Sequence, residues 1–396
     1  MSKLLNIYHW LSAYASSLIN LNPSRKLFVI GVTGTKGKST TLELINAGLE
    51  AAGRKTALIS SVRIKVGDSS EVNKTGNTMP GRGLIQKIMN RAVKEGCGYA
   101  LVEVTSQGVV QHRHEFIDFD EAVFLNLQPE HLESHGGFEN YKQAKLSFFR
   151  YVGNQKNGKS KTFFVNKDDK YAVDFAKAAG RNKIVEFEKS AIKTSLAGDF
   201  NKINAGAAEA VLRNIGVEEK VIKNALRNFG GLSGRMEFVS REPFVAVVDY
   251  AHTPDSLKAV YETVSGMIKK GGRLICVLGS AGGGRDKWKR PEMGKIAAEH
   301  CGYVILTDED PYDEDPLKIL NEIEGGLKSR GITGQYEKIL DRAQAIKKAI
   351  SLAKPGDGVV VTGKGSEPFL HKAKGINIPW SDKKIAEEAI RQISAK

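Results

Sequence analysis

The sequence predicts an α/β protein of two domains, each built on a mostly parallel β-sheet. Short apolar runs rich in Val, Ile, Leu and Phe alternate with helical stretches along the 396 residues. Strands that are apolar throughout are typical of parallel sheets covered by helices on both faces. The glycine-rich segment GGLSG at 230–234 separates two series of such runs. We therefore predict a helical extension at 1–25, a first domain at 26–230 and a second, Rossmann-like domain at 231–396.

Each predicted strand has its own apolar run. In the first domain the runs are 27–32, 56–60, 99–104, 122–127 and 162–165, and in the second they are 244–248, 273–278, 303–306 and 358–361. Clusters of polar residues follow seven of the strands, at 33–41, 103–107, 126–135, 249–255, 279–290, 307–315 and 362–367. Ligands bind outside the carboxyl ends of parallel strands, so we expect binding sites at these clusters.

The bulk composition limits the classes of binding partner and the cellular compartment that we expect. The formal net charge of +14 favours anionic partners. The Lys and Arg residues are scattered without an aromatic-basic motif, so we expect phosphate-bearing and acidic small molecules rather than nucleic acid. The sequence lacks an apolar run of about 18 residues, so we expect no transmembrane helix. We expect a cytoplasmic protein, with Cys97, Cys276 and Cys301 as buried, reduced thiols.

The first twenty residues form a predicted helix of their own. Leu4, Tyr8, Leu11, Ala15 and Leu18 recur near helical spacing, and the segment has a single formally charged side chain, at position 3. Two interpretations stay open. The helix either docks on the first domain or lies in a membrane interface, although its polar face lacks the usual basic residues.

A phosphate-binding loop, or P-loop, is predicted after the first strand. KLFVIGV runs into a glycine-rich turn and then a helix; the turn comprises Gly34, Thr35, Lys36, Gly37, Lys38, Ser39 and Thr40. Backbone N–H groups and a helix N-terminus hold phosphates in such loops. Lys38 would reach the terminal phosphates and Ser39 would bind Mg²⁺. Gly31 lies one residue too early for the general pattern, and the loop by itself does not fix the reaction.

Three later residues suggest a metal site. Glu103 ends the strand YALVEV and suits Mg²⁺, unless it is a solvated strand-end glutamate. His131 follows the strand AVFLNL and is otherwise a surface or capping histidine. Lys145 lies on the apolar stripe of GFENYKQAKLSFFRY. Burial would lower its pKa, and a neutral amine can react with carbon dioxide to give an anionic carbamate ligand. The stripe alone favours a snorkelling lysine.

The motifs together resemble the Mur ligase family, whose members build the peptidoglycan stem peptide. The resemblance covers about residues 27–396 and rests on GVTGTKGKSTT, LVEVTSQ, NLQPEHLESHGGFENYKQAKLSFF, GDFNKINAGAA, LSGRMEFV, VVDYAHTPDSL, GRDKWKRPEMG, TDEDPYDEDP and TGKGSEP. The last five are most similar to members that add the third stem residue. The resemblance implies that ATP phosphorylates a carboxylate and that an amine attacks the acyl phosphate. We expect a monomer or a homodimer.

The resemblance assigns roles by position. It implies catalytic roles for Lys38, His131, Lys145 and Arg235, and metal ligands at Ser39, Glu103, His131 and a carbamylated Lys145. It places Asn201 and Asn204 by the adenine, Asp249 and His252 near the ribose, and Arg235 on the ATP phosphates from the second domain. The substrate channel would be lined by Thr78, Thr105 and Ser106. The incoming amino acid would be held by Arg285, Glu309, Asp310, Pro311, Tyr312, Gly363 and Glu367.

Two departures from the family pattern affect the substrates. Only 30 residues precede Gly31, so we expect no counterpart of the domain that binds the sugar nucleotide. Members that add diaminopimelate carry Asn-Pro-Arg where this chain has Asp-Pro-Tyr at 310–312. With the acidic residues at 313–315 this suits lysine or ornithine, unless 313–315 is a solvated loop. A ligase of the folylpolyglutamate synthetase type and a non-catalytic nucleotide-binding subunit remain alternatives.

Overall fold

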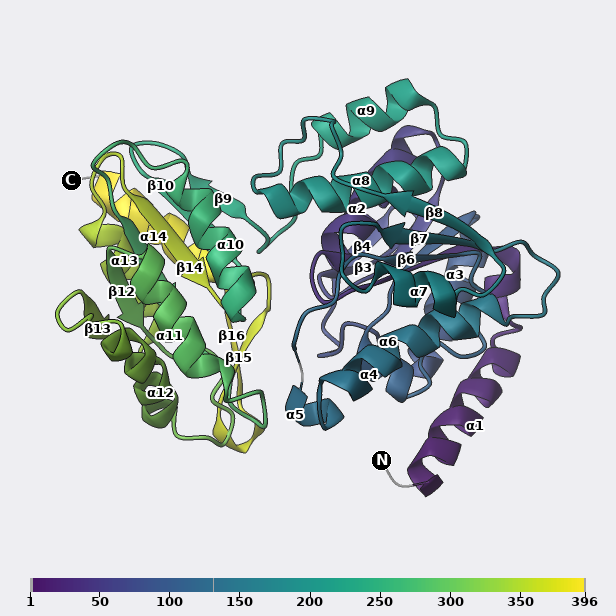
Figure 1. Ribbon diagram of the computed structural model, residues 1–396, viewed down its shortest axis with the longest axis horizontal. Coiled ribbons are helices and arrows are strands. Elements are labelled where there is room, and N and C mark those ends of the chain that lie inside the picture. Colours follow the sequence, from purple (N-terminus) through teal and green to yellow (C-terminus); the bar gives the residue numbers. More distant parts are fainter. Residues whose placement is uncertain (1–2, 131, 395–396) are drawn as a thin grey trace. The chain divides into compact units, whose positions relative to one another are not determined.

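The computed structural model describes residues 3–130 and 132–394, which form two compact units, 1–230 and 231–396. Figure 1 shows a helix-covered sheet in each unit. The first unit has an eight-stranded sheet in the order β4-β3-β2-β5-β1-β6-β7-β8. Its strands are β1 (Phe28–Thr33), β2 (Thr56–Ile59), β3 (Arg63–Val66), β4 (Ser69–Val72), β5 (Tyr99–Glu103), β6 (Glu121–Phe124), β7 (Thr162–Asn166) and β8 (Lys183–Phe187).

Helices cover both faces of this sheet, as its apolar strands predict. The helices are α1 (Lys3–Ile19), α2 (Lys38–Ala51), α3 (Arg82–Lys94), α4 (Ser106–Val110), α5 (Leu132–His135), α6 (Phe138–Gly153), α7 (Ala172–Ala178), α8 (Asp199–Asn214) and α9 (Glu219–Arg227), with a 3₁₀ turn at Pro23–Lys26. Helices α2, α8 and α9 form one apolar core with the sheet, and α3, α6 and α7 form the other. Strand β1 lies between them, with Val29 in one core and Ile30 in the other.

The second unit has a six-stranded sheet in the order β13-β12-β11-β14-β10-β9. Its strands are β9 (Glu237–Ser240), β10 (Val245–Asp249), β11 (Leu274–Leu278), β12 (Tyr303–Leu306), β13 (Tyr336–Lys338) and β14 (Gly358–Thr362), and β15 (Phe369–His371) pairs separately with β16 (Asn377–Pro379). The helices are α10 (Pro254–Ser265), α11 (Lys289–His300), α12 (Pro316–Ser329), α13 (Arg342–Leu352) and α14 (Asp382–Ser394), with a 3₁₀ turn at Ala373–Gly375. Helices α13 and α14 share a core with one sheet face, and α10, α11 and α12 pack side by side.

All nine predicted strands are present, with ends displaced by no more than a few residues. Seven further strands were not predicted: β3, β4, β8, β9, β13, β15 and β16. Every residue of β4 is exposed, so an apolar run could not reveal it. Three of the missed strands, β3, β4 and β9, form the antiparallel pairs β2/β3, β3/β4 and β9/β10, whereas the strands found from apolar runs pair with one another in parallel.

The expectation of three reduced thiols is wrong for two of them. Cys276 on β11 and Cys301 at the end of α11 form a disulfide, with Cα atoms 6.1 Å apart. Cys97 is free and buried. The two bonded cysteines are 25 residues apart in the sequence, and only the return of α11 to the edge of β12 brings them together.

The N-terminal segment is a helix that packs against α3, as the docked interpretation predicts. Among the described residues, none of the helices is long and apolar enough to cross a membrane.

Candidate active site

The phosphate loop connects β1 to α2 at the carboxyl edge of the first sheet. Gly37 is the N-cap of α2 and has φ +85°, a conformation that favours glycine. A Cβ atom at Gly37 would also collide with Oδ1 of Asn204 on α8. The Asn204 side chain donates to Asn201 Oδ1 at 2.9 Å, and both asparagines are buried. The structure therefore places the two predicted adenine-site residues on α8, with Asn204 against the loop.

Asn126 fixes the conformation of the loop. Its Oδ1 accepts the backbone N–H of Thr35 at 3.1 Å and that of Lys36 at 2.9 Å. Its amide donates in return to the Lys36 carbonyl at 3.1 Å. Sequence reasoning included Asn126 only within a polar cluster after the 122–127 run. The sequence signal that could have identified Asn126 is an amide side chain just after a buried strand.

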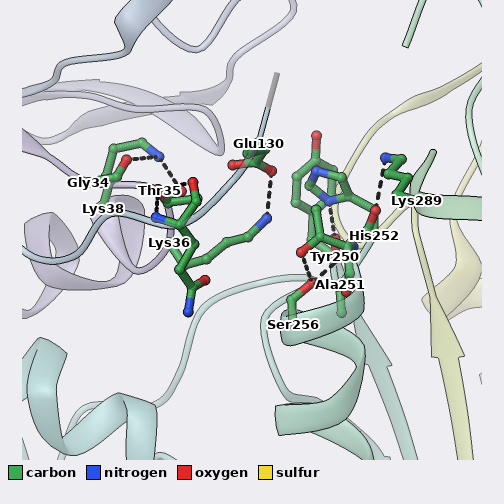
Figure 2. A network of polar contacts seen from close by, with 12 residues as sticks. Gly34, Thr35, Lys36, Lys38, Glu130, Tyr250, Ala251, His252, Ser256 and Lys289 are labelled. Atoms are coloured by element: carbon green, nitrogen blue, oxygen red, sulfur yellow. Dashed lines mark hydrogen bonds and ion pairs between the residues drawn. The ribbon is translucent and has the colours of Figure 1, made fainter. Parts of the chain in front are cut away.

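The two lysines of the loop point in different directions. Lys38 Nζ donates to the carbonyls of Gly34 and Thr35 at 3.0 and 2.9 Å, whereas Lys36 Nζ pairs with Glu130 at 2.7 Å (Figure 2). The amine of Lys38 thus lies over the loop itself, where an amine can meet phosphate oxygens. Lys36 contributes its backbone N–H to the loop.

Ser39 and Glu103 meet beside the loop. The Ser39 hydroxyl donates to Glu103 Oε2 at 2.8 Å, and both side chains are buried. Ser61 adds its backbone N–H to the same oxygen at 2.9 Å. Thr40, the next predicted loop residue, is buried in the first turn of α2. A hydroxyl and a carboxylate at this spacing fit Mg²⁺, which takes one or two carboxylates and completes its shell with phosphates and water.

One predicted metal ligand cannot be placed, because His131 lies outside the described residues. Within 3–130 and 132–394, the structure contains no group of three or more His, Cys, Asp or Glu side chains able to hold a metal.

Lys145 is buried, so the interpretation of a snorkelling lysine is wrong. Only 2% of the residue is exposed, and Nζ donates to the Gly34 carbonyl at 2.8 Å. Burial lowers the pKa of Lys145 well below its ordinary value, and the positive charge of Lys38 lowers it further. Tyr141 lies against it, with the amine 4.9 Å from the ring centroid. The structure thus places an amine with a strongly lowered pKa under the phosphate loop.

The predicted channel residues follow β5 and the loop before α3. Thr105 is the N-cap of α4 and accepts the Gly108 N–H at 3.1 Å. Ser106 is buried and its hydroxyl lies 3.1 Å from His135 Nε2. Thr78 is half-buried and precedes Met79, whose side chain packs on Gly108. Two of the three residues are therefore adjacent at the end of β5, and Thr78 lies in a segment that contacts α4.

In the second unit, Asp249 ends β10 and organises the loop that follows. Its carboxylate accepts the backbone N–H groups of Met236 and Ala251, both at 2.7 Å. The His252 ring bonds to the Tyr250 carbonyl at 2.7 Å and Lys289 donates to the His252 carbonyl at 2.9 Å (Figure 2). The structure thus gives Asp249 a role in fixing the backbone of this loop.

Arg235 and Glu367 both contact Tyr250. The Arg235 guanidinium is 4.2 Å from the centroid of the Tyr250 ring, a cation–π distance. The Tyr250 hydroxyl donates to Glu367 Oε1 at 3.0 Å. Two predicted site residues from segments 132 positions apart are therefore joined through one aromatic ring that the sequence analysis did not single out.

Glu309 is a buried carboxyl group at the carboxyl edge of the second sheet. Its Oε2 has no hydrogen-bond partner among the residues that the structure describes, and it packs so closely on Gly363 that a Cβ atom there would collide with it. Burial raises the pKa of Glu309 to about 7. Ser280, another buried side chain whose hydroxyl lacks a described partner, follows the neighbouring strand β11.

The segment 310–312 is held by a lysine and by a glycine-rich loop. Lys364 Nζ donates to Asp310 at 2.7 Å and to Glu367 at 2.6 Å. The Pro311 carbonyl and the Tyr312 ring lie directly against the glycines at 282 and 283. Tyr312 has φ +52° and stacks on His371 with a centroid distance of 5.3 Å. Arg285 follows these glycines, and although burial lowers its pKa, the hydrogen bond with Tyr312 leaves that pKa raised.

The acidic residues after Tyr312 serve the fold. Asp313 accepts the Lys374 N–H at 2.8 Å, and Asp315 caps α12 through the Leu317 N–H at 2.9 Å. Glu314 pairs with Arg290 at 2.8 Å. The interpretation of 313–315 as a solvated loop is therefore incomplete, since Asp313 and Asp315 are exposed whereas Glu314 is paired with Arg290.

Comparisons with known proteins place the chain in one family. The Mur ligase middle domain matches residues 32–191, and the domain described as "Mur ligase, glutamate ligase domain" matches 234–365. A UDP-N-acetylmuramoyl-L-alanyl-D-glutamate–2,6-diaminopimelate ligase from Syntrophomonas wolfei is 35% identical over 397 residues, covering 93% of this chain and 79% of that protein. The protein of the same name from Halalkalibacterium halodurans is 36% identical over 398 residues, with the same coverage. The chain belongs to the Mur ligase family.

This Mur ligase also resembles solved structures. A UDP-N-acetylmuramoyl-L-alanyl-D-glutamate–2,6-diaminopimelate ligase has 28% identity and a TM-score of 0.60, over 93% of this chain and 79% of that chain. Mycobacterium tuberculosis folylpolyglutamate synthase, complexed with ADP and AMPPCP, has 14% identity and a TM-score of 0.73, over 98% of this chain and 95% of that chain. The second likeness shows the shared fold alone. The relatives identify this Mur ligase as an ATP-dependent acid–amino-acid ligase.

Proposed function

We propose that this Mur ligase adds an amino acid to a carboxylate of a muramyl peptide or a related cell-wall precursor, by way of an acyl phosphate. The names of its relatives support this choice of acceptor. The observation that carries the proposal is the buried Lys145, whose amine lies under the loop that also presents Lys38 and Ser39. A loop that only binds nucleotide has no need of a buried amine with a strongly lowered pKa.

The first unit would bind ATP and hold the charge that develops on its terminal phosphate. The loop N–H groups and the amine of Lys38 would bind phosphate oxygens, and Asn201 and Asn204 would lie by the adenine. Ser39, Glu103, His131 and a carbamylated Lys145 would hold Mg²⁺. That ion, when bound, neutralises negative charge on phosphate oxygens. Thr78, Thr105 and Ser106 would line the path of the acceptor carboxylate.

Lys145 is suited to carbamate formation. The neutral amine forms an N–C bond to carbon dioxide and releases one proton, which leaves an anionic carbamate in place of an uncharged amine. Burial and the positive charge of Lys38 lower the pKa of Lys145 well below its ordinary value, which favours the neutral amine that this reaction needs.

The second unit would supply the remaining nucleotide contacts and bind the incoming amino acid. Arg235 would reach the ATP phosphates, and Asp249 and His252 would lie near the ribose. Arg285, Gly363, Glu367 and residues 309–312 would hold the amino acid. Glu309 is suited to bind its ammonium group, since its carboxylate lacks a described donor at Oε2. We propose lysine or ornithine, because Tyr312 is a poor partner for the distal carboxylate of diaminopimelate.

A substrate panel tests this function. The full chain is mixed with ATP, Mg²⁺, one acceptor and one amino acid, and phosphate release and product mass are measured. We expect turnover with a muramyl dipeptide, with or without UDP, plus lysine or ornithine. Turnover only with a reduced folate plus glutamate would replace the proposal with a folylpolyglutamate synthetase activity. Nucleotide binding without turnover on any pair would identify a non-catalytic subunit.

Substitution of Lys145 tests the site itself. We expect Lys145→Ala to lower kcat by roughly a thousandfold, because it removes a group that contacts the reacting centre. Lys142→Ala is the matched control, since Lys142 lies one turn earlier on α6 and pairs with Asp174 at the surface. Full activity in Lys145→Ala, with Lys142→Ala also active, would eliminate the carbamate.

A further inference from the structure

The N-terminal helix α1 is docked with its polar face inward. Its buried side chains toward the first unit are Ala13, Ser17 and Asn20, with Ser16 half-buried. Ser16 packs closely on α3, because a Cβ atom at Gly83 would lie 3.5 Å from its hydroxyl. Small and polar side chains therefore lie where a docked amphipathic helix normally places its apolar stripe.

The opposite face of α1 is apolar and exposed. Seven large apolar residues on and just after the helix are between 47% and 80% exposed: Leu4, Ile7, Tyr8, Leu11, Leu18, Ile19 and Leu21. Trp10 and Tyr14 border this face, each about 40% exposed, and both rings contact Phe116 at 5.2 and 5.3 Å. Single exposed leucines are ordinary, but a continuous apolar face marks an interaction surface. Figure 1 shows α1 at the periphery of its unit.

The helix against which α1 packs carries positive charge. Neither α1 nor α3 contains an Asp or Glu. Helix α3 contains four basic residues, Arg82, Lys87, Arg91 and Lys94, and the chain as a whole has a net charge of +14. Arg91 is partly neutralised by Glu95, whereas Lys87 is exposed. Helix α1 lacks basic residues on its own polar face, and the neighbouring helix α3 supplies them.

We propose that the outer face of α1 binds the surface of an anionic lipid bilayer. Leucine and isoleucine would enter the acyl boundary, and Tyr8, Trp10 and Tyr14 suit the interface between apolar and wet layers. The lysines and arginines of α3 would lie near the anionic headgroups, which attract them. A second copy fits less well, because an isologous contact through α1 would bring two copies of the basic α3 toward each other.

Flotation with lipid vesicles tests this surface. The full chain is mixed with vesicles of phosphatidylcholine alone, or of phosphatidylcholine with phosphatidylglycerol. We expect flotation with the anionic vesicles, weakened by high salt, and a blue shift of tryptophan emission that is absent in Trp10→Phe. The triple variant Tyr8→Gln, Leu11→Gln and Leu18→Gln should lower partition at least about tenfold. Lys87→Gln should lower partition by several-fold, and only with the anionic vesicles.

The control variant replaces two other exposed apolar residues with glutamine. Val173→Gln with Leu317→Gln removes side chains that are 61% and 53% exposed on α7 and α12, and should leave partition unchanged. Circular dichroism and phosphate release show that each variant is folded. Absence of binding to anionic vesicles, or equal loss in the control, overturns the proposal. A dimer without lipid that the triple variant abolishes would assign the face to a second copy instead.

Discussion

The carboxyl edges of the two sheets use lysine in opposite ways. In the first unit, Lys38 and Lys145 donate to backbone carbonyls of the phosphate loop. In the second unit, Lys364 is locked between the carboxylates of Asp310 and Glu367. In the first unit the two amines therefore lie at the phosphate loop and can interact with an incoming anion. In the second unit the charges fix a loop. Binding of a substrate there depends on the few polar groups that have no partner among the described residues, of which Glu309 is the most important.

The largest effect is expected from the buried ion pair of the second unit. Arg342 and Asp382 are joined at 2.6 Å with side chains about 1% exposed or less. Arg342→Met leaves Asp382 as an uncompensated buried charge, and we expect a loss of roughly 3–5 kcal/mol in the free energy of unfolding. Urea unfolding, with hydrogen exchange to assign the loss to 231–396, measures it.

The counterpart in the first unit sharpens the comparison. Arg63 pairs with the buried Glu43 at 2.6 Å, but its own side chain is 29% exposed. Arg63→Met should cost only roughly 1–2 kcal/mol, since water can reach the pair. An equal loss in both variants would show that buried pairing does not distinguish the two units.

A second contrast concerns the two buried carboxyl groups with raised pKa values. Burial raises the pKa of Glu309 to about 7 and, despite the hydrogen bond from Asn214, that of Glu121 to about 8. Glu121 begins β6 at the amino edge of the first sheet, whereas Glu309 follows β12 at the carboxyl edge of the second. We expect Glu309→Gln to change the pH profile of turnover, and Glu121→Gln to leave that profile as it is.

Both substitutions should change how stability depends on pH. Between pH 4.5 and the raised pKa, the folded chain binds more protons than the unfolded chain, so the free energy of unfolding falls as pH rises and is constant above. Glu309→Gln removes up to about 3 kcal/mol of this fall below pH 7. Urea titrations from pH 4 to pH 8.5 measure the slope. A slope unchanged in both variants would contradict the buried state of these groups.

We expect the phosphate loop at the start of α2 to tolerate substitution less well than the turn after α2. Gly37→Ala places a Cβ at φ +85° and against Asn204, and we expect ATP to bind at least about tenfold more weakly. Gly53→Ala is the control, because Gly53 has φ +72° just after α2 but no neighbouring atom within 4 Å of its Cβ position. Calorimetric titration with ATP separates the two, and equal affinities would contradict the close approach of Asn204.

The smallest effect is expected from Lys36. Its amine pairs with Glu130 away from the loop carbonyls, with 28% of the side chain exposed. Lys36→Met should change stability by roughly 1 kcal/mol or less and ATP affinity by no more than a few-fold. Lys38→Met, measured beside it, should reduce affinity much more. Equal losses would mean that the Lys36 amine also contacts the phosphates.

Much of the fold was predictable because buried parallel strands are apolar throughout. The nine predicted strands came from such runs, whereas every residue of the edge strand β4 is exposed and gives no apolar signal. The loop was predictable because Gly37, Lys38 and Ser39 are adjacent in sequence. Asn126, which holds the loop from 90 residues away, was not.

The sequence by itself determined which reactive groups the chain carries: a phosphate loop, a carboxylate at the end of the strand YALVEV and a lysine on an apolar stripe. Only the tertiary structure decided that Lys145 is buried under Gly34, that Cys276 meets Cys301, and that α1 docks by its polar face. The physical reason is the same in each case. Local spacing fixes which side chains share a face, whereas burial, pairing and charge depend on what the rest of the chain brings against that face.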